Sequence, residues 1–476
     1  MTGRVAVIGG GLAGITAALR CADAGCQVTL FESRPQLGGL THSFNRGELR
    51  VDNGQHVFLR CCTSYLALLD RLGVADRVAL QPRLAIPILT PGADQPVWLR
   101  RTALPAPLHL AGSLLQYRPL SMLERARFAL AAVALRRVDP ASPATDEQDF
   151  GTWLRRHGQS DQAIAALWEL VGVATLNSRA DGASLSLAAT VFQEGLLTDS
   201  TAADIGWSRV PLRELHGDPA LECLTAAGAQ VRTGAAVRGI EPGEGWEVIT
   251  DDARVTADQV IVAVPPPAAE QLLPPGGVDL PAGWAQRLGS SPIVNVHVVL
   301  DRPVLGEPFV AGVDTPVQWV FDRTSHSGLG SGSLAGGQYL AVSLSAADDY
   351  IDMPTGALRE KFLPELAALL PEIRAAQVRD FFVTRERHAT FRPAPGTAAL
   401  RPAATTALPG LFLAGAWTAT GWPATMEGAV RSGEAAATAL LDPSSSPTWR
   451  HNGVRRPSTA TTWRHIGVVG DTGRAS

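Results

Sequence analysis

The chain opens with a strand that turns through glycines directly into a helix. Residues 4–8 read Arg-Val-Ala-Val-Ile, glycines occupy positions 9 to 11, and Gly14 lies in the helical run that follows. In such a turn Gly9 permits the tight bend, Gly11 lets the backbone approach a pyrophosphate, and Gly14 lets the helix pack close to the strand. The sequence therefore predicts a phosphate-binding turn at its start.

The helix and the next strand complete this unit. The helix begins with Leu12 and Ala13, and its N-terminus supplies N–H donors and positive potential to an anion. A second strand at 27–32 ends in Glu32, which is placed to accept hydrogen bonds from the hydroxyls of an adenosine ribose. These features together predict a dinucleotide-binding βαβ unit.

An arginine and a glycine pair follow the second strand, because residues 32–41 read Glu-Ser-Arg-Pro-Gln-Leu-Gly-Gly-Leu-Thr. This run resembles the second fingerprint of FAD-containing oxidoreductases in the amine oxidase and phytoene desaturase superfamily. The resemblance implies an FAD site that includes Ser33, Arg34, Gly38, Gly39 and Leu40. The superfamily usually has an arginine where Leu40 stands, which removes one expected phosphate contact.

Two later segments resemble the rest of the superfamily's flavin domain. Strand-like runs at 228–237, 246–250 and 257–264 match its middle section, where the backbone at Val237 contacts adenine. Near the end of the chain a short strand leads to Gly415, and a helix of small residues begins near Thr425. The N–H groups of that helix are expected to face the flavin. The resemblance implies that Gly415, Ala416, Trp417, Thr425 and Met426 bind the cofactor, although Ala416 replaces an aspartate that usually anchors the ribityl chain.

The predicted fold is α/β, with an FAD-binding Rossmann-like domain assembled from discontinuous segments and an interleaved α+β substrate domain. The FAD-binding domain is expected at 1–70, 205–275 and 395–442, the substrate domain at 71–204 and 276–394, and a disordered tail at 443–476.

Composition narrows the classes of function. The net charge is −4 over 476 residues, which gives no basic footprint for nucleic acid. Glycine, proline or charge interrupts every apolar stretch before it reaches transmembrane length, and we expect no secretory signal because the first strand begins within four residues of the start. The five cysteines show no C-x-x-C spacing, so we expect neither disulfides nor a bound metal. We therefore expect a cytoplasmic location.

Residues 105–138 alternate leucines and other apolar residues with five arginines. This pattern is typical of basic amphipathic helices that lie on an anionic lipid surface or border a lipid-fed cavity. It is equally typical of core-facing helices with an arginine-rich exposed face. The sequence leaves peripheral contact with the inner face of the cell membrane and the core-helix interpretation open.

Three segments narrow the resemblance to one family. Residues 51–59 read Val-Asp-Asn-Gly-Gln-His-Val-Phe-Leu, residues 176–192 hold a Leu-Asn-Ser run, and residues 419–433 form a closing motif. They resemble the hydroxysqualene dehydroxylase family of hopanoid pathways over most of residues 4–441. The resemblance implies reductive removal of a hydroxyl from a hydrophobic isoprenoid, hydroxysqualene, with reduced FAD as the hydride source. It does not identify the reductant of FAD.

The same resemblance suggests catalytic residues in the first of these segments. Such a reaction must protonate or polarise the leaving hydroxyl, and His56 is the first candidate because histidine ordinarily titrates near neutral pH. Asp52 and Gln55 could orient His56 or bind the hydroxyl, although each could equally be a structural hydrogen-bonding residue. His297 alternates with apolar residues and is expected to be a core histidine.

Other readings of the flavin motifs stay open. An amine oxidase commonly sets a lysine beside the flavin, and Lys361 is the single lysine of this chain. A carotenoid desaturase or protoporphyrinogen oxidase would remove hydrogen from a large apolar substrate. A non-catalytic prenyl-binding protein would use the same fold without flavin chemistry.

Overall fold

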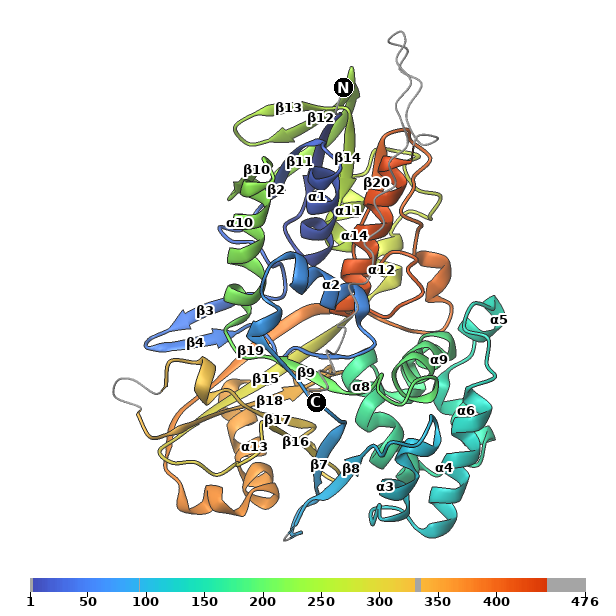
Figure 1. Cartoon of the computed structure of the whole chain (residues 1–476), viewed down its shortest axis with the longest axis vertical. Helices are drawn as coiled ribbons and strands as arrows, with labels where there is room; N and C mark the ends of the chain where they lie inside the picture. The colour runs from blue at the N-terminus through green and yellow to red at the C-terminus, as the bar shows by residue number, and fades with distance from the viewer. Residues whose placement is uncertain (1–2, 94, 330–334, 443–476) are drawn as a thin grey trace, which may run out of the picture. The chain divides into compact units, whose positions relative to one another are not determined.

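The computed structural model describes residues 3–93, 95–329 and 335–442. These residues form an α/β structure with a five-stranded parallel sheet and a seven-stranded mixed sheet (Figure 1). The predicted fold class, with a Rossmann-like nucleotide-binding sheet, is confirmed. The tail predicted at 443–476 lies outside the described residues, and the domain boundaries stay predictions.

The parallel sheet has the strand order β10-β2-β1-β14-β20. Its strands are β1 (Arg4–Ile8), β2 (Gln27–Glu32), β10 (Gln230–Thr233), β14 (Gln259–Val262) and β20 (Leu411–Leu413). β1 lies in the centre and pairs in parallel with β2 and β14. Its apolar run is buried on both faces, as is typical of a central parallel strand. Three separate parts of the chain thus supply one sheet.

Helices cover one face of this sheet and a small antiparallel sheet covers the other. The helices are α1 (Leu12–Asp23), α2 (Thr63–Arg71), α10 (Asp218–Ala226) and α14 (Met426–Leu441). Figure 1 shows α1 and α14 side by side, and a Cβ on Gly433 of α14 would lie 2.2 Å from the carbonyl oxygen of Ala13. On the opposite face, Trp246 and Val248 pack in one cluster with Ala6 of β1. The antiparallel strands are β11 (Val237–Gly243), β12 (Gly245–Thr250) and β13 (Arg254–Ala257).

The seven-stranded sheet has the order β19-β15-β18-β17-β16-β7-β8. Its strands are β7 (Ala85–Leu89), β8 (Val97–Arg100), β15 (Ser290–Leu300), β16 (Phe309–Gly312), β17 (Trp319–Asp322), β18 (Gln338–Leu344) and β19 (Val378–Phe391). Helix α13 (Thr355–Leu369) shares its core cluster. β15 is buried over almost its whole length, which exceeds the half-burial that its alternating pattern predicts.

The remaining strands connect the two large sheets. They are the hairpin β3 (Ser43–Arg46) and β4 (Leu49–Asp52), and the three-stranded set β5 (Val57–Leu59), β6 (Val78–Leu80) and β9 (Ile205–Ser208).

The other α-helices are α3 (Ala111–Leu115), α4 (Met122–Leu135), α5 (Pro143–Asp146), α6 (Phe150–Arg156), α7 (Asp161–Ala163), α8 (Glu169–Leu176), α9 (Leu185–Phe192), α11 (Pro266–Leu272) and α12 (Trp284–Leu288). Within the described ranges, every helix is too short or too polar to cross a lipid bilayer.

Two predicted boundaries differ from the structure for local reasons. The strand predicted at 228–237 ends at Thr233, because Gly234 takes a φ of 68° that turns the chain. The strand predicted at 257–264 ends at Val262, and the prolines that follow it open helix α11. Proline suits a first helical turn because its missing N–H has no partner to lose there.

Candidate functional site

The loop after β1 owes its shape to two of its glycines. Gly9 takes a φ of 110°, and a Cβ there would lie 2.5 Å from the carbonyl oxygen of Ala263, the residue that follows β14. A Cβ on Gly14 would lie 1.9 Å from the carbonyl oxygen of Gly9. Any side chain at these two positions would push the first turn of α1 away from β1 and β14. Both glycines are therefore required by the fold itself.

Gly11 differs, because neither its backbone angles nor a steric contact within the protein requires glycine at this position. It is the N-cap of α1 with a φ of −77° and a ψ of 177°, a conformation open to any residue. A Cβ there would meet only the Cα of Gly39, at an ordinary 3.8 Å. The space that a side chain would fill lies at the N-terminus of a twelve-residue helix that starts with Leu12 and Ala13, where positive potential favours an anion. The loop at residues 9–11 and the start of α1, which together we call the cradle, thus fit the pyrophosphate of a dinucleotide.

The glycine pair of the second fingerprint lies against this cradle. The N–H of Gly38 donates to the carbonyl oxygen of Gly10 at 2.8 Å, and Gly39 takes a φ of 57°. The guanidinium of Arg34 donates to the carbonyl oxygen of Gly39 at 3.2 Å, while Leu40 leaves 36% of its surface exposed. The structure therefore brings the two predicted cofactor segments together.

Glu32 holds both loops through its carboxylate. Oε2 accepts from the N–H of Gly10 at 2.7 Å, and Oε1 accepts from the N–H of Arg34 at 2.8 Å and from the hydroxyl of Ser33 at 3.1 Å. A carboxylate has about four acceptor positions, so capacity for a ribose hydroxyl is left. Glu32 thus has a structural role in addition to the predicted ribose contact.

The segment before Val237 is tied to the same loop. The N–H of Ala235 donates to the carbonyl oxygen of Glu32, and that of Gly234 donates to the carbonyl oxygen of Arg34, each at 2.9 Å. Val237 follows at the start of β11 and is half-buried. The predicted adenine-side residue therefore lies near the predicted ribose-side residue.

The closing segment turns at Gly415, whose φ is 135°. Its N–H donates to the hydroxyl of Ser432 on α14 at 2.8 Å, and Thr425 caps α14 by accepting from the N–H of Gly428 at 3.0 Å. Met426, predicted to bind the cofactor, is the first residue of α14, and Ala416 is half-buried beside Gly415. The helix predicted to begin near Thr425 is confirmed.

Trp417 packs in the core although it was predicted in the cofactor set. Its indole nitrogen donates to the carbonyl oxygen of Val264 at 3.0 Å, and its ring centroid lies 5.2 Å from that of Trp284. Only 5% of the residue is exposed. The indole thus joins residues 414–425, which we call the closing loop, to the residues just after β14.

Arg401 organises the closing loop and was missed by sequence reasoning. Its guanidinium is buried and donates to the carbonyl oxygens of Thr418 and Trp422, both at 2.7 Å. Burial lowers the pKa of Arg401 to about 10, and the guanidinium lies 4.6 Å from the centroid of the Phe391 ring. Because Arg401 belongs to no recognised motif, no sequence signal could have identified it.

Glu427 is a second buried residue for which the sequence predicted no role. Its carboxylate accepts from the N–H groups of Ser64 at 3.2 Å and Tyr65 at 2.8 Å, and pairs with Arg431 at 2.6 Å. It thereby caps α2, whose own N-cap residue, Cys62, makes no side-chain cap. The only available signal was its place within the closing motif.

Asp52 is fully engaged in holding neighbouring segments. One oxygen accepts from the hydroxyl of Ser43 at 2.6 Å and from the N–H of Leu212 at 3.0 Å, and the other pairs with Arg323 at 2.5 Å. Only 6% of Asp52 is exposed. This geometry suits a positioning role better than proton transfer.

His56 lies four residues after Asp52 in a half-buried position. Burial lowers the pKa of His56 to about 4, against the opposing effect of the Asp52 carboxylate. The ring is therefore uncharged at neutral pH, rather than about one quarter protonated as the ordinary pKa of about 6.5 predicts. A Cβ on Gly54 would lie 3.3 Å from Nε2 of His56 and 3.9 Å from Nδ2 of Asn295, so these groups share one small region.

Unpaired polar atoms occur in the same region. Nε2 of Gln55 and Oδ1 of Asn295 are buried and have no hydrogen-bond partner among the described residues. An unsatisfied buried polar group costs about 1–3 kcal/mol, so a ligand or water that bonds these atoms would be stabilised. His297 is instead satisfied, since it bonds Tyr339 at 2.7 Å and Thr384 at 3.0 Å. The prediction of a core histidine is confirmed for His297.

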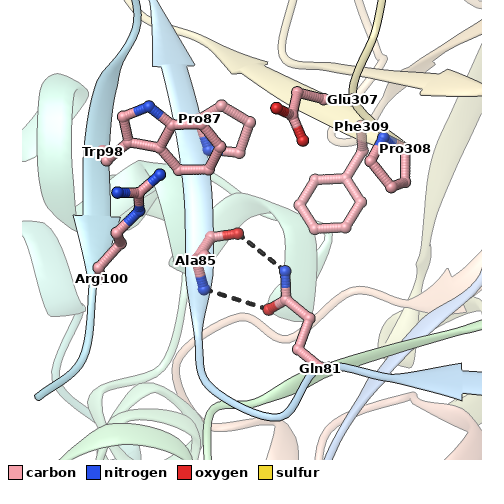
Figure 2. Close-up of a pocket in the computed structure, with 8 residues that line it drawn as sticks. All are labelled: Gln81, Ala85, Pro87, Trp98, Arg100, Glu307, Pro308 and Phe309. Atoms are coloured by element: carbon pink, nitrogen blue, oxygen red, sulfur yellow. Dashed lines mark hydrogen bonds between the residues drawn. The ribbon is translucent and has the colours of Figure 1, made fainter.

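A cavity of about 270 Å³ lies elsewhere, on the seven-stranded sheet (Figure 2). Figure 2 shows Trp98 and Arg100 of β8 on one side and Phe309 of β16 on the other. The Arg100 guanidinium lies 3.9 Å from the centroid of the Trp98 ring. None of the lining residues belongs to the predicted cofactor segments.

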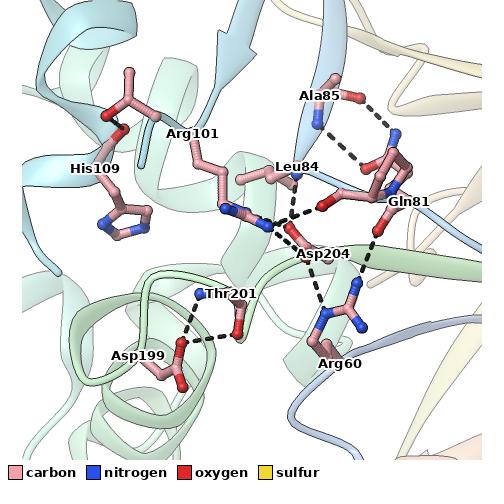
Figure 3. A network of polar contacts seen from close by, with 11 residues as sticks. Arg60, Gln81, Leu84, Ala85, Arg101, His109, Asp199, Thr201 and Asp204 are labelled. Atoms are coloured by element: carbon pink, nitrogen blue, oxygen red, sulfur yellow. Dashed lines mark hydrogen bonds and ion pairs between the residues drawn. The ribbon is translucent and has the colours of Figure 1, made fainter. Parts of the chain in front are cut away.

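A buried ion-pair network fixes the segment beside this cavity (Figure 3). Asp204 accepts from Arg60 at 2.9 Å, from Arg101 at 2.6 Å and from the N–H of Leu84 at 2.7 Å. Hydrogen bonds from the two arginines and Leu84 lower the pKa of Asp204 against the effect of burial, which is the largest single influence. The network links residues that directly flank β5, β7, β8 and β9, and it is structural.

Comparison with known proteins identifies the family. The profile described as "Flavin containing amine oxidoreductase" matches residues 12–441. A hydroxysqualene dehydroxylase of Rhodopseudomonas palustris is 30% identical, over 93% of this chain and 99% of the relative. One from Sinorhizobium fredii is 29% identical, over 94% and 100%. A probable zeta-carotene desaturase of Synechococcus elongatus is 26% identical, over 92% and 98%.

Solved structures agree on the fold. Putrescine oxidase bound to putrescine superimposes with a TM-score of 0.68 at 20% identity, over 93% of this chain and 99% of the other. At this identity the likeness shows the fold alone. The family match and the full-length relatives confirm the predicted FAD cofactor and enzyme class. The chain belongs to the family of flavin-containing amine oxidoreductases and is an FAD-dependent oxidoreductase.

Proposed function

We propose that this enzyme reduces hydroxysqualene to squalene and water. The observation that carries the proposal is full-length similarity to two hydroxysqualene dehydroxylases at about 30% identity. The segment around Asp52 and His56, which suggested this family from sequence, lies beside unpaired polar atoms of Gln55 and Asn295.

The reaction sets clear requirements for the site. A carbon–oxygen bond breaks and a carbon–hydrogen bond forms, the hydroxyl leaves with one proton as water, and two electrons are consumed. Reduced FAD supplies those two electrons as a hydride when it is bound. The protein must supply the proton, bind the leaving oxygen and exclude bulk water.

In this proposal His56 supplies the proton. Its pKa of about 4 makes the protonated ring a strong acid toward a leaving hydroxyl, although little of it is protonated at neutral pH. Gln55 contributes the unpaired Nε2 donor to the same oxygen. Asp52, fixed by Arg323 and Ser43, positions the segment that carries both residues. The cofactor contacts are proposed for the two fingerprint loops, the Val237 segment and the closing loop described above.

A carotenoid desaturase is the second candidate, since a probable zeta-carotene desaturase is 26% identical over nearly the whole chain. This reaction removes hydrogen and would run with oxidised FAD. The amine oxidase alternative loses support, because Lys361 lies in α13 and not in a predicted cofactor segment. Its Nζ lies 5.8 Å from the centroid of the Tyr350 ring, which packs against the core cluster of the seven-stranded sheet. No other lysine is present in the chain.

One experiment separates these activities. Purified enzyme is incubated without oxygen, either with chemically reduced FAD and hydroxysqualene or with oxidised FAD and zeta-carotene, and the products are identified by mass spectrometry. Squalene in the first reaction alone supports the proposal. A desaturated carotenoid without squalene assigns the second activity, and flavin-loaded enzyme that is inactive in both reactions contradicts both candidates.

A further inference from the structure

Most large apolar side chains that the described surface exposes come from one short stretch. Of twelve such residues, seven fall within thirty residues of one another. Five of these seven leave more than half of their surface exposed, while Leu104 leaves 50% and Val133 leaves 42%. The set is Leu104, Leu108, Leu115, Met122, Leu123, Leu130 and Val133. We call this set, with the arginines at 118, 127, 136 and 137, the 104–137 surface. Contiguous exposed apolar side chains mark an interaction site.

The exposed residues of α4 fall on one side of the helix. Met122, Ala126, Leu130 and Val133 recur at spacings of four, four and three, which places them on one stripe. The opposite side packs inward, where Ala131, Ala132 and Leu135 are buried and the Phe128 ring lies 4.6 Å from that of Trp168. The helix is therefore apolar on both sides, and only one side has a partner among the described residues.

The helix α4, which carries most of these exposed side chains, is anchored to the rest of the protein. Ser121 and Glu124 form a reciprocal capping box at the start of α4. Glu124 also accepts from the hydroxyl of Ser160 at 2.7 Å, which ties α4 to the neighbouring α7. The stripe is thus held rigidly on the surface.

The charge around the stripe is basic. Residues 104–137 hold five arginines and one glutamate in a chain whose net charge is −4. Arg118, Arg127, Arg136 and Arg137 are exposed, and no ion pair is recorded for any of them among the described residues. In α4 the helical spacing places Arg127 and Arg136 on either side of the apolar stripe. The occupant must therefore be apolar at its centre and anionic around it.

We propose that the 104–137 surface docks the protein on an anionic lipid bilayer. Apolar side chains enter the region between headgroups and acyl chains, while arginines remain at the level of the phosphates. A two-fold contact with a second copy fits less well, because it would bring the arginines that border the two stripes close together. Docking of this kind does not depend on which substrate the flavin reduces.

Vesicle sedimentation tests this proposal with the full chain. Sucrose-loaded vesicles of phosphatidylcholine alone, or with one quarter phosphatidylglycerol, are mixed with the protein and spun down. We expect pelleting mainly with phosphatidylglycerol, and weaker binding at 1 M salt, where the Debye length falls to about 3 Å. The variant R127Q/R136Q should lose about fivefold in partition coefficient for each arginine. The variant L123S/L130S should lose at least about tenfold.

Matched controls come from outside the surface. L221S/L441S removes two other exposed leucines, and R287Q removes an exposed arginine on α12. Both should sediment like the wild type, and flavin content and melting temperature report that every variant is folded. The proposal is overturned if the wild type stays in the supernatant with anionic vesicles, or if L123S/L130S pellets undiminished. A lipid-free dimer that L123S/L130S converts to monomer would assign the surface to a second copy.

Discussion

Gly39 faces Gly11 so closely that a Cβ on Gly39 would lie 2.8 Å from the Cα of Gly11. The two glycines come from the two fingerprint loops, so the loops meet backbone to backbone. Nothing larger fits on the Gly39 side, whereas a Cβ on Gly11 would make only an ordinary contact of 3.8 Å with the Cα of Gly39. A substitution at Gly39 should therefore disturb the fold, whereas a substitution at Gly11 should affect only ligand binding.

Gly11→Val should abolish FAD binding and leave the apo-protein folded. The backbone angles of Gly11 suit valine, and the side chain would occupy the space proposed for the pyrophosphate. Flavin absorbance per protein and the melting temperature of the apo-protein measure the two effects. Gly356→Val, at an open position in α13, is the control and should keep both. Stoichiometric FAD in folded G11V would contradict the cradle assignment.

Glu32→Ala should weaken FAD binding and also destabilise the apo-protein. The substitution removes the ribose acceptor and leaves the N–H groups of Gly10 and Arg34 without the carboxylate. Each buried unsatisfied donor costs about 1–3 kcal/mol. FAD titration and urea denaturation of the apo-protein measure the two losses separately. Unchanged FAD affinity would show that Glu32 acts on the protein loops alone.

Arg401→Met should detach the closing loop. The variant leaves the carbonyl oxygens of Thr418 and Trp422 without their charged donor. Hydrogen bonds to charged groups contribute about 1.5–3 kcal/mol each, so we expect a loss of about 3 kcal/mol or more in the free energy of unfolding. FAD affinity should fall in parallel, whereas R238M, at an exposed ion pair, should change neither quantity.

His56→Ala should keep FAD and lose dehydroxylation by about 10²–10⁴-fold, the range typical of general acid catalysis. If His56 is the acid, kcat/KM of the wild type should also rise about tenfold for each pH unit between pH 7 and 5.5, because the protonated fraction grows toward a pKa of about 4. Product formation with flavin occupancy measured in the same sample checks both. A flat pH profile with a large loss in H56A would make His56 a neutral hydrogen-bond donor, and full turnover in H56A would exclude it.

The enzyme should lose stability as the pH falls below 6.5. Burial lowers the pKa of His216 and that of His297 to about 3, whereas in the unfolded chain both have the ordinary pKa of about 6.5. Between these values the unfolded chain binds protons that the folded protein does not. Stability is therefore complete above pH 6.5 and falls by about 3 kcal/mol per pH unit for the two residues together.

Urea denaturation at pH 7, 6 and 5 measures this slope. H297Q should show a shallower slope than the wild type, whatever its absolute stability. The control H388Q, at an exposed histidine, should leave the slope unchanged. Equal slopes for the wild type and H297Q would show that His297 does not contribute to the acid sensitivity.

The sequence predicted the local elements because their signals are local. The βαβ unit follows from the spacing of Gly9, Gly11 and Gly14, and the start of α14 follows from the capping preference of Thr425. Arg401 and Glu427 escaped prediction because the segments they hold together, the loop at Thr418 and Trp422 and the start of α2, are bonded through backbone groups, which carry no residue-specific signal. The cofactor role of Trp417 stays a prediction from the resemblance, and its contact with Trp284 is a tertiary one that the sequence does not signal. The low pKa of His56 likewise results from tertiary burial.

The strand order of the parallel sheet affects when the cofactor domain can be completed during synthesis. β20 and α14 are the last described elements of the chain, yet β20 pairs with β14 and α14 packs on α1, where Gly433 meets Ala13. During synthesis α1 therefore lacks its neighbour α14 until residues 426–441 have been made. The packed cofactor domain is therefore completed late in translation, and a nascent chain stalled before residue 411 carries both fingerprint loops but lacks β20, the closing loop and α14.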